Sequence, residues 1–290
     1  MFLQLLSSTL RLSTPLIFAA LGGLLSERSG VVNIALEGLM LVGAFAAAAG
    51  TSLTHSPWLG LGCGLAAGLA LAGLYALFVI RFRANQIVAG TAINLLALGL
   101  TPFVCKLFYG VTGSTPAIPL EERFRAAPLW LCWLVVLLCW LALRHTPAGL
   151  WLSFAGEHPQ ALHAAGIRVN RVRWLAVLLS GALAGLGGAS LSIYLSSQFS
   201  RNMTAGRGFM ALAALIFGKW KPIPAALACL LFGLADAVQI RLQGVPVWGG
   251  KPVPVQFIQM LPYVVTILVL AGLVGRSRPP TALGRPFDTK

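Results

Sequence analysis

The stretch WLGLGCGLAAGLALAGLYALFVI, residues 58–80, contains no Asp, Glu, Lys or Arg. It is longer than the roughly 20 residues that a helix needs to cross a bilayer. It is rich in Leu, Ala and Gly, and it lacks the alternating polarity of a membrane β-strand. Because lipid cannot satisfy exposed backbone groups, such a segment must close its hydrogen bonds internally, as an α-helix does. The stretch therefore predicts a transmembrane helix.

Similar apolar runs recur along the whole chain. They lie at about 12–25, 31–50, 87–107, 128–143, 174–195, 208–218, 223–240 and 256–274. Only 10% of the residues are charged, whereas a soluble domain carries about 25%. The predicted fold is all-α, a polytopic membrane protein with about 8–9 transmembrane helices. The run 208–218 is short, so a broken or re-entrant helix is the alternative there.

The basic residues predict how the chain lies in the membrane. Its net charge is +14, but the Lys and Arg residues are spread between the apolar runs, which argues against a nucleic-acid surface. Loops beside spans favour Lys and Arg on the cytoplasmic side. The loop 144–173, with Arg144, Arg168, Arg171 and Arg173, is therefore placed in the cytoplasm. Residues 1–275 then form a single transmembrane domain, and 276–290 form a basic cytoplasmic tail.

No residue pattern indicates catalysis or metal binding. The five cysteines form no CxxC pair, and the four histidines lie outside the spans without triad or zinc spacing. Buried small side chains are the simpler interpretation of the cysteines. The sequence thus predicts no catalytic residue and no metal ligand.

The segment GEHPQALHAAGI, residues 156–167, is polar in a chain that is otherwise apolar. Pro159 can open a helix at its first turn, and Gly166 can close it in the left-handed conformation. Glu157 would favour the positive end of the helix dipole. A compact apolar face is expected from Ala161, Leu162 and Ala165. The segment predicts a two-turn helix across the cytoplasmic end, either for a partner to grip or as an ordinary amphipathic loop helix.

Four stretches together carry a family resemblance. GEHPQALHAAGIRVNRVRWLAVLLSGALAGLGGA (156–189) resembles the coupling loop and the following helix of ABC-importer permeases for branched-chain amino acids, simple sugars and nucleosides. SERSGVVNIALEGLMLVGAFAA (26–47) resembles the family's turn followed by an Asn and a Glu. RANQIVAGTAINLLALGLT (83–101) and GVTGSTP (110–116) are similar to permeases for nucleosides and related purines.

This resemblance implies a permease subunit in the inner membrane of a bacterium. The residues expected to couple it to an ATPase are Gly156, Glu157, Pro159, Ala165 and Gly166. It implies separate ATP-binding subunits, a second permease subunit and an extracytoplasmic solute-binding protein, all working at the lipid bilayer. No GxxxxGK[ST] motif occurs, because the nearest string, GKW at 218–220, lacks the glycine spacing of that motif. No cofactor is therefore expected on this chain, and ATP–Mg is expected on the partner subunits.

Polar side chains inside the spans are candidates for the substrate pathway. Asn33 and Glu37 are four residues apart, which predicts a shared helix face, and Thr91 lies one turn before Asn94. Amides can match the donors and acceptors of a nucleoside or a sugar. Two alternatives stay open: the two Asn residues hold helices together, and Glu37 pairs with Arg28 or caps backbone groups.

Two other functions remain in view. A simple-sugar permease, of the ribose type, is the first, because the preference for nucleosides over sugars rests on the resemblance alone. An ion-coupled secondary transporter would work without an ATPase, and it would be expected to show carboxylates around an ion site. The apolar runs offer few, chiefly Glu37 and Asp236.

Overall fold

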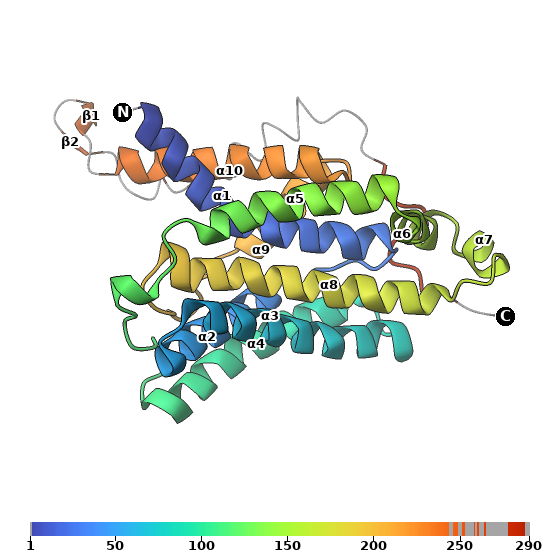
Figure 1. The fold of residues 1–290 in the computed structure, drawn as a ribbon, viewed down its shortest axis with the longest axis horizontal. Helices are drawn as coiled ribbons and strands as arrows, with labels where there is room; N and C mark the ends of the chain where they lie inside the picture. The colour runs from blue at the N-terminus through green and yellow to red at the C-terminus, as the bar shows by residue number, and fades with distance from the viewer. Residues whose placement is uncertain are drawn as a thin grey trace.

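In this computed structural model the chain is an elongated bundle of α-helices (Figure 1). The structure describes residues 2–243, 246–248, 251–252, 258, 260, 264 and 278–287. Within these residues, seven helices are long and apolar enough to cross a membrane. The prediction of a polytopic helical membrane protein is confirmed.

The long helices are α1 (Phe2–Arg28), α2 (Leu36–Thr54), α3 (Pro57–Ala76), α4 (Gln86–Tyr109), α5 (Ala127–His145), α8 (Val169–Ser190) and α10 (Pro222–Leu242). Single π-helical turns extend α3 and α8, namely η1 (Leu77–Arg81) and η3 (Leu191–Leu195). The shorter elements are η2 (Leu120–Glu122), α6 (Pro147–Glu157), α7 (Pro159–Ala164), α9 (Arg207–Phe217), and the antiparallel strands β1 (Pro246–Trp248) and β2 (Lys251–Pro252).

The predicted count of 8–9 spans is not confirmed. The run 208–218 corresponds to α9, which has 11 residues and is too short to cross alone. The run 256–274 lies almost entirely outside the described residues. The loop 144–173 also holds more than one short helix, because α6 precedes α7 there and packs against α1, α5 and α8.

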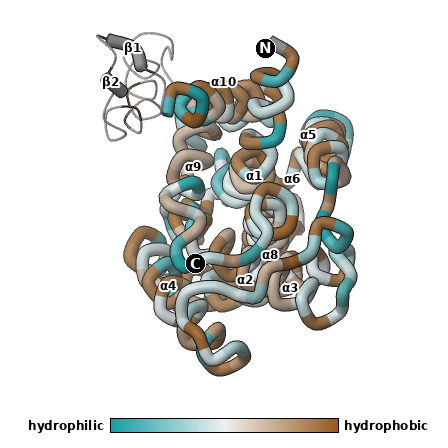
Figure 2. Tube along the Cα trace, turned by 90° about the vertical axis from the view of Figure 1, so that its left-hand side faces the viewer, coloured by the Kyte–Doolittle hydropathy of each residue, from teal (hydrophilic) through white to brown (hydrophobic). Residues whose placement is uncertain are grey.

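Helix α8 forms the centre of the bundle, in contact with α1, α2 and α3 (Figure 2). Glycines allow this close packing, because they recur at helical spacing on α3 (Gly60, Gly64, Gly68) and on α8 (Gly181, Gly185, Gly188). A Cβ atom added to Gly185 would lie 2.4 Å from the carbonyl oxygen of Gly64. A Cβ atom added to Gly188 would lie 1.8 Å from the oxygen of Met40. These helices therefore meet backbone to backbone, as small residues permit in membrane proteins.

The chain doubles back into the bundle between α1 and α2. Gly30 turns it with φ +94°, and residues 31–33 run without helical structure. The side chain of Asn33 reaches Ser180, about halfway along α8. Helix α2 then begins at Leu36, beside Gly23 of α1. The helix start is thus buried in the bundle rather than placed at its surface.

A second interruption lies between α8 and α9. Residues 197–200 pair with the segment 114–118, and the chain then descends to the start of α2. Two residues of this descent, Asn202 and Ala205, have positive φ angles of 56° and 44°. Helix α9 therefore starts inside the bundle, which explains its short length.

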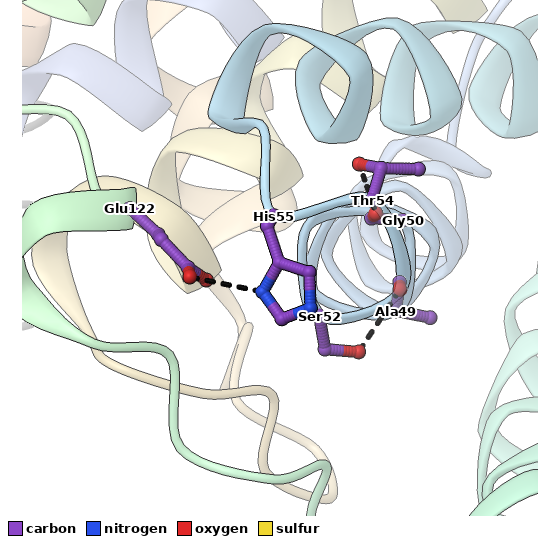
Figure 3. Close-up of polar contacts among 6 residues, drawn as sticks. All are labelled: Ala49, Gly50, Ser52, Thr54, His55 and Glu122. Atoms are coloured by element: carbon purple, nitrogen blue, oxygen red, sulfur yellow. Dashed lines mark hydrogen bonds and ion pairs between the residues drawn. The ribbon is translucent and has the colours of Figure 1, made fainter.

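The segment 110–126 closes the end of the bundle that carries the α2–α3 turn. Figure 3 shows His55, at the end of α2, with Nδ1 2.9 Å from Oε1 of Glu122. The hydroxyl of Ser52 bonds the carbonyl of Ala49 and lies 2.7 Å from the hydroxyl of Tyr109. The His55–Glu122 contact ties the segment to α2, and the Ser52–Tyr109 contact ties the end of α4 to α2.

The opposite end, called the α7 end below, carries α6, α7, the turns 82–85 and 218–221, and residues 278–287 (Figure 1). Arg144 of the loop 144–173 belongs to this end, and so do four further basic residues, Arg81, Arg83, Lys219 and Lys221. Its cytoplasmic placement stays a prediction that this gathering of positive charge supports.

Candidate functional site

The carboxylate of Glu37 holds the first turn of α9. Its Oε1 accepts a hydrogen bond from the backbone N–H of Gly206 at 2.9 Å, and its Oε2 accepts one from Gly208 at 2.7 Å. Glu37 is 6% exposed. The first N–H groups of a helix have no partner within it, and the helix dipole favours a negative charge there. Glu37 thus caps backbone groups of a helix about 170 residues away in sequence.

Of the two alternatives stated for Glu37, capping is therefore the one observed. Arg28 is engaged elsewhere, since its Nη2 donates to Oγ of Ser153 at 2.9 Å. The shared helix face predicted for Asn33 and Glu37 is wrong. Asn33 precedes α2 in the non-helical segment, because the turn at Gly30 delays the start of the helix.

Asn94 of α4 binds the chain at the α1–α2 interruption, around the start of α2. Its Oδ1 accepts from the N–H of Gly38 at 2.8 Å, and its Nδ2 donates to the carbonyl of Ile34 at 2.9 Å. Thr91 is exposed, and its hydroxyl bonds the carbonyl of Val88 at 2.9 Å. The two residues therefore do not act as a pair: Asn94 faces α2, while Thr91 faces outward.

Asn33 is fully buried, with half of its amide used. Its Nδ2 donates to Oγ of Ser180 at 2.7 Å, while its Oδ1 has no hydrogen-bond partner among the described residues. Neighbouring backbone groups are held by two other side chains. Oε1 of Gln86 accepts from the N–H of Val32 at 2.7 Å, and the hydroxyl of Tyr75 donates to the carbonyl of Val32.

These contacts show that the buried polar residues of the predicted pathway have structural partners within the chain. Asn33, Glu37 and Asn94 bond the backbone or a side chain of neighbouring helices, so they hold the two interruptions together. Of the four predicted pathway residues, Thr91 is the exposed one. Tyr75 and Ser180 were missed as partners. A tyrosine inside the apolar run 58–80 was an available signal, because a buried hydroxyl needs a hydrogen-bond partner.

At the α7 end, the short helix forms as predicted. Pro159 begins α7, and Gly166 follows its last turn with φ +81°. The N–H of Ile167 returns to the carbonyl of Leu162 at 3.2 Å. Leu162 is 4% exposed and packs on Ala155 and Val169, so it anchors the helix rather than forming its outer face. Ala161 and Ala165 are exposed.

Two of the predicted coupling residues belong to α6 instead. Glu157 is the last residue of α6, and its Oε2 accepts from the N–H of Thr281 at 3.3 Å, so it does not cap α7. Gly156 is buried, and a Cβ atom there would lie 2.3 Å from the carbonyl oxygen of Arg28. Its own carbonyl accepts from the N–H of Ala282 at 2.8 Å. Both residues therefore fasten the segment 278–287.

Arg173 joins three parts of the α7 end. It is 3% exposed and donates to the carbonyls of Ser29 (3.1 Å), Arg285 (2.8 Å) and Ala155 (3.3 Å). One guanidinium thus ties the α1–α2 interruption, the end of α6 and the segment 278–287 together. The sequence placed Arg173 in a basic loop and gave no sign of this role.

A cavity of about 550 Å³ lies between α7 and residues 281–287. Glu157, Pro159 and Arg173 line it, together with Thr281 and Phe287. It opens beside the exposed side of α7, so it could accept a side chain of a docked partner. Among the residues that the structure describes, no group of three or more His, Cys, Asp or Glu could hold a metal ion.

Comparison with known proteins shows which family has this sequence pattern. The family profile described as "Branched-chain amino acid transport system / permease component" matches residues 5–270. The guanosine ABC transporter permease protein NupQ of Bacillus subtilis (strain 168) is 41% identical, over 97% of this chain and 95% of that protein. The nucleoside ABC transporter permease protein NupC of Lactococcus lactis subsp. cremoris (strain MG1363) is 41% identical, over 94% and 92%. A putative glucose ABC transporter permease protein of Haloferax volcanii, TsgC13, is 35% identical, over 98% and 97%.

Proposed function

The chain belongs to the family of permease components of branched-chain amino acid transport systems, and from this membership we propose that it is the membrane-embedded permease subunit of an ATP-driven importer for nucleosides or related purines. The observation that carries the substrate class is the similarity, over nearly the full length, to permeases named for guanosine and for nucleosides. The relative named for glucose has a lower identity and keeps a sugar as the second candidate.

The proposed assembly contains this chain, a second permease subunit, two ATP-binding subunits that carry ATP–Mg, and a solute-binding protein on the outer side of a bacterial inner membrane. Helix α7 would dock on an ATP-binding subunit through its exposed side, and Pro159, Ala165 and Gly166 would shape that contact. Glu157 and Gly156 would support it indirectly, because they fasten residues 281–282 behind α7. The substrate pathway would form against the second permease subunit, with Thr91 on the exposed side of α4.

Uptake of labelled solutes by proteoliposomes tests the function. The assembled complex is expected to import guanosine and adenosine in an ATP-dependent manner, with other nucleosides competing and ribose not competing. Ribose uptake without nucleoside uptake would show that the substrate is a sugar, while the chain would still be an importer subunit. Uptake by this chain alone, driven by an ion gradient and independent of the ATPase, would replace the mechanism with secondary transport.

The docking role of α7 makes a separate prediction. Replacing Ala165 by Arg puts a large charged side chain on the exposed helix end, where about 1–3 kcal/mol of contact energy would be lost. ATPase co-purification is therefore expected to fall by roughly fivefold or more. Insertion of the permease should not change, because Ala165 is exposed and lies outside the candidate spans. Ala117→Arg, an equal change at an exposed site of the opposite end, is the control. Normal co-purification and uptake with Ala165→Arg would place the docking surface elsewhere.

A further inference from the structure

A basic cavity of about 360 Å³ lies at the α7 end, between the end of α1, the end of α5 and the start of α10. Each of these elements contributes one cation: Arg28 from α1, Arg144 from α5 and Lys221 from the turn before α10. The remaining lining residues are Trp140 and apolar side chains, and no carboxylate lines the cavity among the described residues. Three positive charges therefore share one recess.

The neighbouring contacts position these cations. Arg28 donates to Ser153 at 2.9 Å, and the Arg144 guanidinium lies 5.5 Å from the centroid of the Trp140 ring. Two consecutive residues before Lys221, Lys219 and Trp220, have positive φ angles of 50° and 53°, a conformation that side chains disfavour. Such strain persists where the surroundings impose it.

The indole of Trp220 holds the turn 218–221 in place. Its Nε1 donates to Oε2 of Glu27 at 2.7 Å, and both residues are buried. This contact fixes the turn that presents Lys221, and it also engages the carboxylate next to Arg28. The other nearby acid, Glu157, acts on Arg28 electrostatically but also accepts from Thr281. Arg144 and Lys221 have no carboxylate within 4.0 Å among the described residues.

The surroundings of the cavity are apolar. Leu143 lines it and also lines a second cavity of about 240 Å³, whose walls are apolar residues of α1, α5, α6 and α8. Ile223 at the rim is exposed, and the membrane-spanning part of α5 is only 22% buried within the chain. A ligand here would meet positive charge at the end of the bundle and hydrocarbon beside it. A free anion would make no use of the apolar walls.

We propose that this cavity, called the basic recess, binds the phosphate headgroup of an anionic phospholipid in the leaflet at the α7 end. Arg144 and Lys221 contact the phosphate as charge-assisted donors, Trp140 lies at the interfacial level, and an acyl chain runs past Leu143. Basic pockets between transmembrane helices have the chemistry for such headgroups. Because the recess joins α1, α5 and α10, the lipid stabilises the packing of these three helices.

The test measures the lipids retained by the assembled complex. After delipidation, the complex is placed in nanodiscs with equal amounts of phosphatidylglycerol and phosphatidylcholine, and native mass spectrometry counts the lipids carried into the gas phase. The wild type is expected to retain phosphatidylglycerol in preference to phosphatidylcholine. The double variant Arg144→Gln/Lys221→Gln is expected to bind it about tenfold or more weakly. Arg28 stays unchanged because it also bonds Ser153.

Matched variants separate the recess from general surface charge. Arg81→Gln/Arg168→Gln removes two exposed charges from the same end outside the recess and should retain the lipid like the wild type. Arg144→Lys/Lys221→Arg keeps the charges and should also retain it. Equal retention by the Gln variant and the wild type, or equal retention of phosphatidylcholine, would overturn the proposal. Release of the lipid by excess inorganic phosphate would also overturn it, because the recess would then be a site for soluble phosphate. A cross-link from Lys221 to an acidic residue of a partner subunit would overturn it as well.

Discussion

Replacement of Glu37 by leucine is expected to remove most of the folded permease. The change takes both acceptors from the N–H groups of Gly206 and Gly208 and removes the negative charge at the start of α9. A buried donor left without a partner costs about 1–3 kcal/mol, and the charge at a partly buried helix end contributes up to about 2 kcal/mol. The expected loss of about 2–8 kcal/mol is, at its upper end, comparable with the whole stability of many domains.

Thermal unfolding of the detergent-purified complex, together with the yield of monodisperse protein, measures this effect. Glu37→Gln keeps one acceptor and should lie between the wild type and the leucine variant. Glu121→Leu removes an exposed carboxylate from η2 and should leave the unfolding temperature almost unchanged. A normal yield and unfolding temperature for Glu37→Leu would mean that the α9 terminus has another stabilising partner, and the role assigned to Glu37 would be wrong.

Replacement of Arg173 by leucine is expected to uncouple ATP hydrolysis from transport. The carbonyls of Ser29, Ala155 and Arg285 lose their shared donor, while the packing of α8 in the bundle stays. Each hydrogen bond to a charged group contributes about 1.5–3 kcal/mol, so the connection between α6 and the α1–α2 interruption should fail. Nucleoside uptake should fall by tenfold or more, while the ATPase activity of the assembled complex falls by less than about threefold.

The ratio of ATP hydrolysed to solute imported is the decisive measurement, because a purely structural loss lowers both rates together. Arg171→Leu, at an exposed position on the same helix, should keep the ratio of the wild type. Arg173→Lys preserves the charge without the planar guanidinium, so it should restore the ratio only in part. A proportional fall of both rates in Arg173→Leu would show that Arg173 stabilises the fold without transmitting movement.

Much of the fold follows from hydrophobic length and glycine spacing. The runs at 58–80 and 174–195 predict α3 and α8, and their glycines predict close helix packing. The structure shows such packing where Gly185 meets Gly64. These features depend on residues near in sequence or on a simple repeat. The α7 helix is equally local, since Pro159 and Gly166 mark its two ends.

The polar contacts were less predictable, because their partners are distant in sequence. Nothing around Glu37 indicates that it caps α9, since the helix start it serves depends on a descent of the chain at 201–206. Asn33 and Glu37 share a helix only if α2 begins before residue 33, and one turn at Gly30 prevents that. Side chains inside membrane spans can therefore be recognised as important from sequence, whereas their partners require the fold.

The contact between residues 281–285 and the α1–α2 interruption has a consequence for biosynthesis. The N–H of Gly284 donates to the carbonyl of Gly30, so two segments about 250 residues apart complete each other. At roughly 5–20 residues per second, the ribosome needs about 13–50 s to make the second segment after the first. During that time the carbonyl of Gly30 lacks the partner that Gly284 later provides. Insertion factors and chaperones thus meet a nascent chain in which the α1–α2 interruption, made early, gains its last contacts only when residues 281–285 are made.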